Sequence, residues 1–466
     1  MQTPTTTSIH KVRRDALGGK RGDGHKRLGQ RIVRPDPRCI RVAEGDASLT
    51  GCGGLASFGA FLRQQGIDRE LVQRFSRLKA GPLVVYPMPA QMRLLIDAAT
   101  VGADRVFGLE SWAADPLFVR LAGGVIPSLD TVYRDLARFD DAAIAELEGW
   151  MAQQGMVDVP HRRNARVHID VDSTVEPLFG TQEGALPGPN PRYHGRPSYH
   201  PMLAAIAETS TVIAAELRPG DTGFGDEQAG FIGRSIDRAR AHSPSAIVCV
   251  RIDAAGDCTR LMTTIAERSA YFFIKAKMDR PLCESVTLRP TWKTVDVDAH
   301  GHALTQVAEV PYLRPSWIEA GLAVRTIARR TREHTSGRQT ALWEGADWTT
   351  QVFLTNDPYI DPADVPFEYN GRASVEPLIA ELKQAWAIGK VPSETFVANH
   401  AMFLRKRLAH NLLRRFVRHT RLPHLQTWRA SWIRRVLLCV PGRLLRSGRR
   451  WSLRLPPGSP LIPMRC

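Results

Sequence analysis

The sequence predicts an α/β protein in which an N-terminal helical domain precedes a sheet-containing core, and a β-rich insertion interrupts that core. Three observations lead to this prediction. Apolar residues recur at helical spacing from Leu55 to Phe75, polar and apolar residues alternate from Val167 to Val175, and a continuous apolar run extends from Ala246 to Ile252. These patterns are typical of a packed helix, a half-buried strand and a buried central strand, respectively.

Length and composition are those of a globular protein. The chain has 466 residues, which suits two or three domains, and it is 43% hydrophobic and 24% charged. It has no apolar run of about eighteen residues and no apolar segment near its N-terminus, so we expect neither a membrane span nor a secretory signal, and a cytoplasmic location. Seven cysteines are an odd number without zinc-site spacing, so we expect free thiols.

The net charge of +16 is concentrated at the two ends of the chain. Residues 1–38 contain ten basic and three acidic residues, and residues 401–466 contain sixteen basic residues and no acidic one. Such ends are typical of a protein that binds a polyanion, because each phosphate neutralised by Lys or Arg releases counterions. The alternative is a basic tail that only keeps the protein soluble.

We expect six segments along the chain. In order, they are a flexible basic arm at 1–50, a helical DNA-binding domain at 51–160, the first part of the α/β core at 161–280, the β-rich insertion at 281–359, the second part of the core at 360–425 and a basic C-terminal tail at 426–466.

Residues 110–139 of the helical domain predict two helices joined by a glycine turn. Ser128 is a candidate N-cap, and the polar residues between 130 and 134 would lie on the first turns of the second helix. A helix-turn-helix places such residues against bases and phosphates. The alternative is a helical hairpin that only packs.

The alternating strand at 167–175 carries Asp170 and Asp172 on one face and valine and isoleucine on the other. The acidic face is either a candidate site or a solvated surface. Two more strands, at 199–207 and 212–217, follow it, and this meander fits a ribonuclease H-like sheet. A helix is expected at 227–241.

Asp253 stands at the end of the continuous apolar strand. A strand end is where a rigid sheet delivers a side chain to a cleft, so this carboxylate is a candidate site residue. Asp257 is its competitor, which we interpret as the N-cap of a helix at 258–267. A further strand is expected at 271–275.

The β-rich insertion contains several tryptophans: Trp292, Trp317, Trp343 and Trp348. A tryptophan in a β module is usually core, but one of these could instead stack on a base flipped out of a DNA duplex.

Four residues with a distinctive spacing follow the insertion: Tyr369, Arg372, Glu376 and Lys383. Ser374 is a candidate N-cap and Pro377 fits the first turn, so a helix should begin almost at the glutamate. Glu376 and Lys383 then project from one face about two turns apart. A carboxylate suits a divalent metal, and a lysine beside it suits a phosphate.

The last part of the chain predicts a long amphipathic helix with a basic face at 394–420 and a small β-hairpin at 436–456. Arginines of this hairpin are candidates for phosphate contacts, which position DNA without reading its sequence.

The spacing from Tyr369 to Lys383 resembles the Tyr-Arg-Glu-Lys signature of the DDE transposases that move bacterial insertion sequences. Residues 168–185 resemble the first-aspartate strand of that family, and residues 250–257 resemble its second. The resemblance spans residues 167 to about 400, and it is strongest to the transposase DDE domain, group 1. It implies a ribonuclease H-like catalytic core.

The resemblance also implies a set of site residues. Asp172, Asp253 and Glu376 would be the catalytic and metal-binding carboxylates, with Asp172 chosen over Asp170 because the family's aspartate precedes Ser or Thr. Two Mg²⁺ ions, for which Mn²⁺ can substitute, would serve a two-metal phosphoryl transfer. Tyr369, Arg372 and Lys383 would then bind DNA phosphates.

The activity implied is cut-and-paste transposition, in which hydrolysis frees a 3′ end and that end then attacks target DNA. The partners implied are double-stranded DNA, as terminal inverted repeats and target, and a second copy of the chain in a synaptic homodimer associated with the bacterial nucleoid. Alternatives are a nuclease on the same scaffold, a catalytically silent DNA-binding derivative and a decayed element copy. The intact carboxylates argue against the silent derivative.

Overall fold

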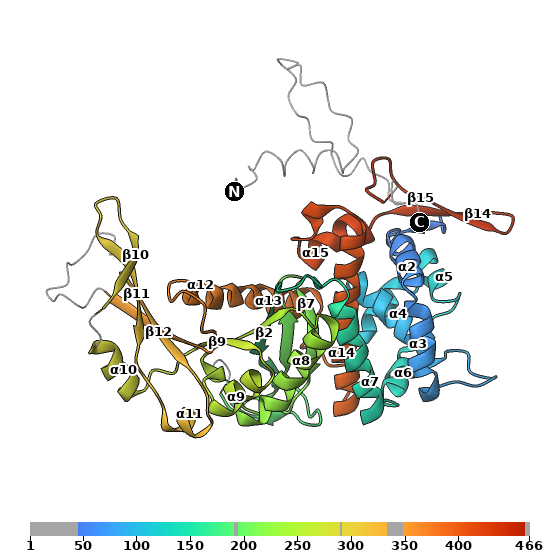
Figure 1. Cartoon of the computed structure of the whole chain (residues 1–466). Helices are drawn as coiled ribbons and strands as arrows, with labels where there is room; N and C mark the ends of the chain where they lie inside the picture. Colours follow the sequence, from blue (N-terminus) through green and yellow to red (C-terminus); the bar gives the residue numbers. More distant parts are fainter. Residues whose placement is uncertain (1–44, 191–193, 289–290, 333–347, 462–466) are drawn as a thin grey trace, which may run out of the picture. The chain divides into compact units, whose positions relative to one another are not determined.

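The computed structural model describes residues 45–190, 194–288, 291–332 and 348–461 (Figure 1). Most of the expected basic arm at 1–50, and Trp343, therefore lie outside the described residues. The chain forms two compact units, one of residues 1–135 with 416–466 and one of residues 136–415. No helix in the described ranges is both long enough and apolar enough to cross a membrane.

The first unit is mainly helical, as the spacing of apolar residues predicts. Leu55, Phe58, Leu71 and Phe75 are all buried in its core. Its elements are β1 (Leu49–Thr50), α2 (Leu55–Gln64), α3 (Ile67–Phe75), α4 (Met88–Thr100), α5 (Pro116–Leu121), α6 (Leu129–Leu136), α15 (Ala430–Ile433), β14 (Gly442–Ser447) and β15 (Arg450–Arg454). The three strands form a small sheet in the order β1-β14-β15.

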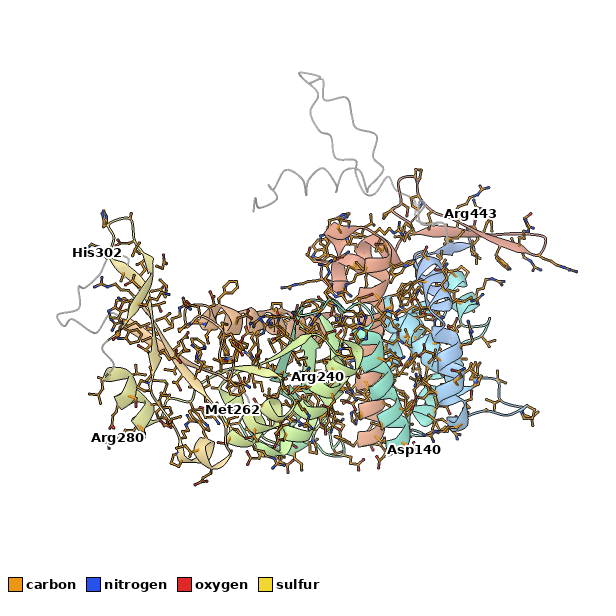
Figure 2. All side chains as sticks on the ribbon, in the orientation of Figure 1. Asp140, Arg240, Met262, Arg280, His302 and Arg443 are labelled. Carbon is orange, nitrogen blue, oxygen red and sulfur yellow. The ribbon has the colours of Figure 1, made fainter. Side chains whose placement is uncertain are left out.

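The expected helix, glycine turn and helix are confirmed as α5 and α6. Gly123 and Gly124 adopt φ values of 98° and 95° between the helices, a region that glycine enters without steric cost. The backbone N–H of Thr131 donates to Ser128 Oγ at 3.3 Å, as expected for a cap. The hairpin expected at 436–456 is confirmed as β14 and β15, on which Arg443 lies (Figure 2).

The second unit is built around a nine-stranded mixed sheet within the described residues, in the order β10-β11-β12-β13-β9-β8-β2-β6-β7. Strand β2 runs parallel to β8, and β8 runs parallel to β9, whereas β6 lies between β2 and β7 and is antiparallel to both. The central strands are β2 (Arg166–Ser173), β6 (Met202–Ile206), β7 (Thr211–Glu216), β8 (Ile247–Ile252) and β9 (Tyr271–Lys275). A separate small sheet contains β3 (Glu176–Pro177), β5 (Pro197–Tyr199) and β4 (Leu186–Pro187).

Helices cover both faces of this sheet (Figure 1). On one face, Val167, Ile169 and Val171 of β2 belong to a large apolar core with α8 (Ala229–His242) and α9 (Thr259–Glu267). On the other face lie α12 (Val365–Asn370) and α13 (Val375–Ala385). The period of two along β2 therefore points its polar residues toward the face that α12 and α13 cover.

The β-rich insertion extends the central sheet. Strand β13 pairs with β9 through Phe353 and Lys275 and through Leu354 and Ile274. The elements of this region are α10 (Arg280–Thr287), β10 (Lys293–Val297), β11 (Ala303–Val310), α11 (Pro315–Glu319), β12 (Arg325–Arg332) and β13 (Trp348–Thr355). Figure 2 labels Arg280 on α10 and His302 next to the start of β11.

The tryptophans of the insertion differ in their surroundings. Trp317 is fully buried, as expected of a core residue. The guanidinium of Arg330 is 4.2 Å from the ring centroid of Trp292 and 4.7 Å from that of Trp348. Their aromatic faces are therefore in contact with a cation of the chain itself.

The long helix expected at 394–420 is confirmed as α14 (Phe396–His419), but its expected basic face is wrong for the part in the second unit. Lys406 donates to the Ala387 carbonyl at 2.6 Å, and Arg414 donates to the Glu381 carboxylate at 2.9 Å. Both side chains are buried. Protein carbonyls and a carboxylate, and not solvent, therefore surround these charges.

The limits of the two compact units differ from the domain limits that we expected from the sequence. Helix α7 (Asp141–Met156), which we expected within the helical domain at 51–160, falls in the second unit. There Thr211 of β7 donates to the Gly155 carbonyl at 2.7 Å, and Asn411 donates to the Met151 carbonyl at 3.0 Å. The tail at 426–466 falls in the first unit with the helical residues.

Candidate catalytic site

The parallel pairing of β2 and β8 sets the position of the first two candidate carboxylates. Asp170 of β2 stands opposite Arg251 of β8 in the register. Asp172 lies two residues further along β2, and Asp253 follows the last residue of β8. Because the two strands run in the same direction, both aspartates lie at the same edge of the sheet.

Arg372 joins these two carboxylates. Its Nη2 atom is 3.1 Å from Asp172 Oδ2 and 3.9 Å from Asp253 Oδ2. The Arg372 side chain is 10% exposed, and that of Asp172 is 19% exposed, so solvent screens their attraction only in part. Asp253 is more open, and it accepts a hydrogen bond from the Ala255 backbone N–H at 2.9 Å.

The chain reaches this site through three short helical pieces. Tyr369 lies at the end of α12, Arg372 lies in the 3₁₀ helix η6 (Gly371–Ser374), and Glu376 lies in the first turn of α13. Pro377 occupies that first turn, as expected. Ser374 occupies the N-cap position of α13, as expected, but its side chain makes no capping hydrogen bond and instead donates to Asp170 Oδ2 at 3.0 Å.

The pKa of Asp172 is raised to about 6. Burial is the main cause, and the charges of Asp253 and Glu376 raise the pKa further, whereas Arg372 lowers it. The charges of Asp253 and Glu376 therefore both act on the Asp172 carboxyl. Among the described residues, no group of three or more His, Cys, Asp or Glu side chains is arranged so that it could hold a metal ion.

Tyr369 packs beside the carboxylates. Its ring lies 4.9 Å from that of Phe353 between centroids. The pKa of its hydroxyl is raised, mainly by burial and also by the charges of Asp253 and Asp172, whereas Arg372 lowers it. Tyr369 therefore belongs to the same cluster as Arg372.

Lys383 contacts different groups. Its ammonium donates to the Val175 carbonyl at 3.0 Å and is 3.2 Å from Glu176 Oε1. Glu176 is 11% exposed at its side chain, and burial raises its pKa while Lys383 lowers it. In this structure, Lys383 is thus paired with a carboxylate of the chain.

Asp170 and Asp257 are both held by arginines. Asp170 is 1% exposed and accepts from Arg251 at 2.6 and 3.0 Å, so this part of the strand face is not solvated. The N-cap interpretation of Asp257 is wrong. Its carboxylate accepts from Arg314 and from the Lys277 backbone N–H, and α9 begins after Cys258 without a side-chain cap.

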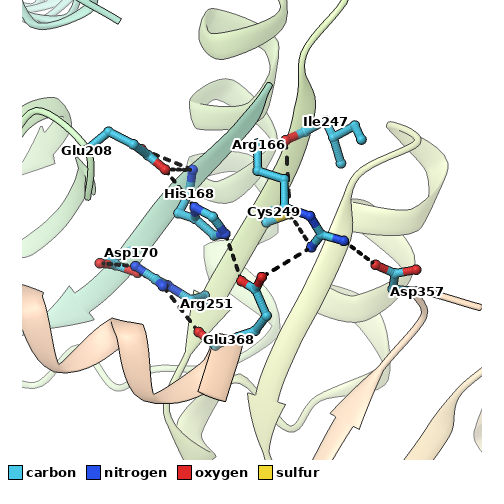
Figure 3. Close-up of polar contacts among 9 residues, drawn as sticks. All are labelled: Arg166, His168, Asp170, Glu208, Ile247, Cys249, Arg251, Asp357 and Glu368. Carbon is cyan, nitrogen blue, oxygen red and sulfur yellow. Dashed lines mark hydrogen bonds and ion pairs between the residues drawn. The ribbon is translucent and has the colours of Figure 1, made fainter. Parts of the chain in front are cut away.

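Sequence reasoning missed a polar network beside the carboxylates (Figure 3). His168 bridges two carboxylates, with Nδ1 2.6 Å from Glu208 Oε1 and Nε2 2.9 Å from Glu368 Oε2. Arg166 is 3.7 Å from Glu368 and donates to Asp357 at 3.0 Å. A signal was present, since His168 shares the alternating face of β2 with both aspartates and Glu368 directly precedes Tyr369.

Comparisons with known proteins give the family of this chain. The structure of the piggyBac transposase synaptic complex with hairpin DNA, determined by cryo-electron microscopy, matches with a TM-score of 0.44 and 11% identity over 82% of this chain and 79% of that one. No curated protein matches. The family model of the transposase DDE domain, group 1, matches residues 36–464. The chain therefore belongs to the transposase DDE domain group 1 family.

Proposed function

We propose that this transposase-family chain catalyses cut-and-paste DNA transposition of an insertion sequence. One observation carries the proposal, namely the cluster of Asp172, Asp253 and Arg372 at the shared edge of β2 and β8, with Glu376 contributing to the field at Asp172. Fixed carboxylates and a cation at one sheet edge are the groups that phosphoryl transfer uses.

The strand order supports a ribonuclease H-like core. In the part of the sheet from β7 to β9, three antiparallel strands, β7, β6 and β2, are continued by β8 and β9, which run parallel to β2. This order puts the first strand of the core at its centre, beside the strand that ends at Asp253. The arrangement is the one expected for a core that delivers two aspartates together.

The chemistry of the donor set fits a divalent metal. Asp172, Asp253 and Glu376 offer oxygen ligands, which Mg²⁺ and Mn²⁺ prefer, and a bound cation would offset the charges of Asp253 and Glu376, which add to the effect of burial in raising the pKa of Asp172. When bound, a pair of such ions supplies activation of the attacking oxygen and stabilisation of the leaving oxygen at phosphorus. The three carboxylates would hold these ions after a rearrangement, because in the described residues they are not grouped so as to hold one.

The cations and the tyrosine have roles of their own in this proposal. Arg372 balances the charge of Asp172 and Asp253 and would also bind a non-bridging phosphate oxygen of DNA. Tyr369, packed against Phe353, would orient that region through a phosphate hydrogen bond. Lys383 would bind phosphate once its ammonium has left the Glu176 carboxylate.

Double-stranded DNA is the proposed partner, as terminal inverted repeats and as target. The exposed arginines of the β14–β15 hairpin are the proposed contacts of the first unit with phosphates, and the polar start of α6 is its proposed contact with bases. Two copies of the chain would hold the two element ends in a synaptic homodimer.

The test is cleavage of a labelled duplex that carries the element's terminal repeat, in Mg²⁺ and in EDTA. We expect Asp172→Asn, Asp253→Asn and Glu376→Gln each to abolish nicking at the repeat boundary while end binding persists, because the metal ligands are lost and the DNA contacts are not. Asp298→Asn, at a partly exposed carboxylate in the β10–β11 turn, is the control.

The outcomes separate the alternatives. Retained cleavage in one of the three variants removes that residue from the metal site. Tight, salt-sensitive binding with no cleavage by the unaltered chain would replace this proposal with a silent DNA-binding derivative. Cleavage without joining of the freed 3′ end to target DNA would indicate a nuclease.

A further inference from the structure

We propose that His168, Asp170 and Arg251 are positioning residues that hold the segment Glu368–Ser374, and with it Arg372, against the candidate carboxylates. This inference rests on the proposed function, because it assigns the groups that keep that site assembled. None of the three is proposed to touch a metal or DNA.

The first end of the segment is held at Glu368. Its carboxylate is 2.9 Å from His168 Nε2 and 3.7 Å from Arg166 Nη1, and its backbone carbonyl accepts from Arg251 Nη1 at 3.1 Å (Figure 3). His168 is itself fixed, because Glu208 contacts both its ring Nδ1 and its backbone N–H. Side chains from β2 and β8 thus contact both the side chain and the backbone of Glu368 in α12.

The second end of the segment is held at Ser374. Its hydroxyl donates to Asp170 Oδ2 at 3.0 Å. The same carboxylate accepts from Arg251 through Oδ1 and Oδ2, so Arg251 contributes to both ends. Because Asp170 is 1% exposed and Arg251 is 5% exposed at its side chain, water offers these groups no alternative partners.

The residues of the candidate site lie between these two ends or directly after them. Tyr369 and Arg372 fall between Glu368 and Ser374, and Glu376 follows two residues later. The intervening backbone is helical, in α12 and then η6, so fixing its ends fixes the direction in which Arg372 projects. That direction brings its guanidinium to 3.1 Å from Asp172.

The alternation along β2 explains why one strand can both hold the segment Glu368–Ser374 and supply a candidate metal ligand. His168, Asp170 and Asp172 occupy successive positions on the same face, with Cys249 and Arg251 of β8 beside the first two. The first two members of this row hold the segment, and the third is a candidate metal ligand. Displacement of the segment relative to β2 would therefore change the distance between Arg372 and Asp172.

The experiment compares full-length variants by hydrogen exchange and by cleavage. The variants are His168→Ala, Ser374→Ala and Ser374→Thr. The matched control is Arg238→Ala, which removes another partly buried ion pair of the second unit, with Glu148 at 2.9 Å, without touching the segment. Each variant is measured for amide exchange of residues 365–374, thermal unfolding, affinity for the terminal repeat, single-turnover cleavage and the Mg²⁺ concentration for half-maximal cleavage.

We expect His168→Ala and Ser374→Ala to lose exchange protection within residues 365–374 while the strands of the sheet stay protected. Cleavage should fall about tenfold and the half-maximal Mg²⁺ concentration should rise about tenfold, with repeat affinity unchanged. Ser374→Thr, which keeps the hydroxyl, should behave as the unaltered chain, and Arg238→Ala should lower thermal stability without local loss of protection.

The inference is overturned if the segment keeps its protection in both alanine variants, or if Ser374→Thr is as impaired as Ser374→Ala. The exchange measurement needs no active enzyme. Loss of local protection in a chain that does not cleave would therefore support the positioning role and count only against the proposed function.

Discussion

At the scale of single residues, the site depends on how charges are distributed among a few buried groups. Arg372 lies 3.1 Å from Asp172 and lowers the pKa of that carboxyl, as does the hydrogen bond from the Ser173 backbone N–H, while Asp253 and Glu376 raise it. Burial raises it most, to about 6. Arg372 therefore favours the ionised form of Asp172, which is the form that can ligate a metal.

Arg372→Ala should accordingly make cleavage more sensitive to acid. Without the guanidinium, the pKa of Asp172 rises further. At pH 6 a larger fraction of this carboxyl is therefore protonated in the variant than in the unaltered chain, and at pH 8 the difference is smaller. We expect the deficit of the variant, relative to the unaltered chain, to be about tenfold larger at pH 6 than at pH 8. Single-turnover rates at both pH values measure it, with Arg280→Ala as a surface control. An equal deficit at the two pH values would contradict this account.

His168 gives a second dependence on pH, in stability. Burial lowers its pKa, but hydrogen bonds with Cys249, Glu208 and Glu368 more than compensate, and raise it to about 11 from 6.5. A pKa raised by folding contributes stability that is complete below the unfolded value near 6.5 and is lost as the pH rises toward 11.

The unaltered chain should therefore lose on the order of 2 kcal/mol more of its free energy of unfolding than His168→Gln between pH 6 and pH 10. Urea unfolding of both proteins at the two pH values measures this difference. His302→Gln, at an exposed histidine that pairs with Asp298, is the control. Identical losses in His168→Gln and the unaltered chain would show that His168 does not carry the effect.

At the scale of elements, the sequence predicted those that depend on local pattern. The strand expected at 271–275 is β9 with the same limits, and the helix, glycine turn and helix at 110–139 are present, because periodicity and turn residues are local signals. The pairing of β13 with β9 was not predictable, since a strand does not encode its partner. Ser374 takes the predicted N-cap position, but its side chain bonds to the distant Asp170 and not to the helix. Asp257 is not the cap of α9, because the distant Arg314 holds its carboxylate.

The Asp257–Arg314 pair joins the region before α11 to the loop between β8 and α9. Asp257 is 5% exposed, and it also accepts from the Lys277 backbone N–H at 2.7 Å. We expect Asp257→Asn to cost about 2 kcal/mol in the free energy of unfolding, because the partly buried Arg314 loses its closer carboxylate and keeps only Asp279, at 3.6 Å.

The double variant Asp257→Asn with Arg314→Met should lose less free energy of unfolding than the sum of the two single variants, since neither partner then keeps a charge whose ion pair has been broken. Urea denaturation of the four proteins of this cycle provides the measurement. Strict additivity would mean that the pair does not couple these elements.

At the scale of the whole molecule, charge is separated along the chain. The last 66 residues hold sixteen basic residues and no acidic one. Some of these, such as Lys406 and Arg414, are buried on α14, whereas those of the β14–β15 hairpin are largely exposed. The basic composition was therefore visible in the sequence, but its division into structural and surface charges required the fold.

The exposed hairpin arginines should set the salt dependence of DNA binding. Changing Arg446, Arg449 and Arg450 together to alanine should reduce the slope of log K against log salt by up to about 3, since each phosphate contact releases counterions. Filter binding or fluorescence anisotropy between low and moderate salt measures the slope. The matched triple change to lysine, which keeps the charge, should leave the slope near that of the unaltered chain, and an unchanged slope in the alanine variant would remove the hairpin from the interface.

The alternation along β2 has a consequence for how copies of such a chain decay. Substitution of one residue in this strand alters one face at one point. Deletion or duplication of a single codon within this strand moves the residues on one side of the change to the opposite face, so that apolar residues replace members of the row His168, Asp170 and Asp172 on the site face while polar groups enter the apolar core. A length change of one residue would thus abolish site and core together, so this strand should tolerate point changes far better than in-frame insertions or deletions.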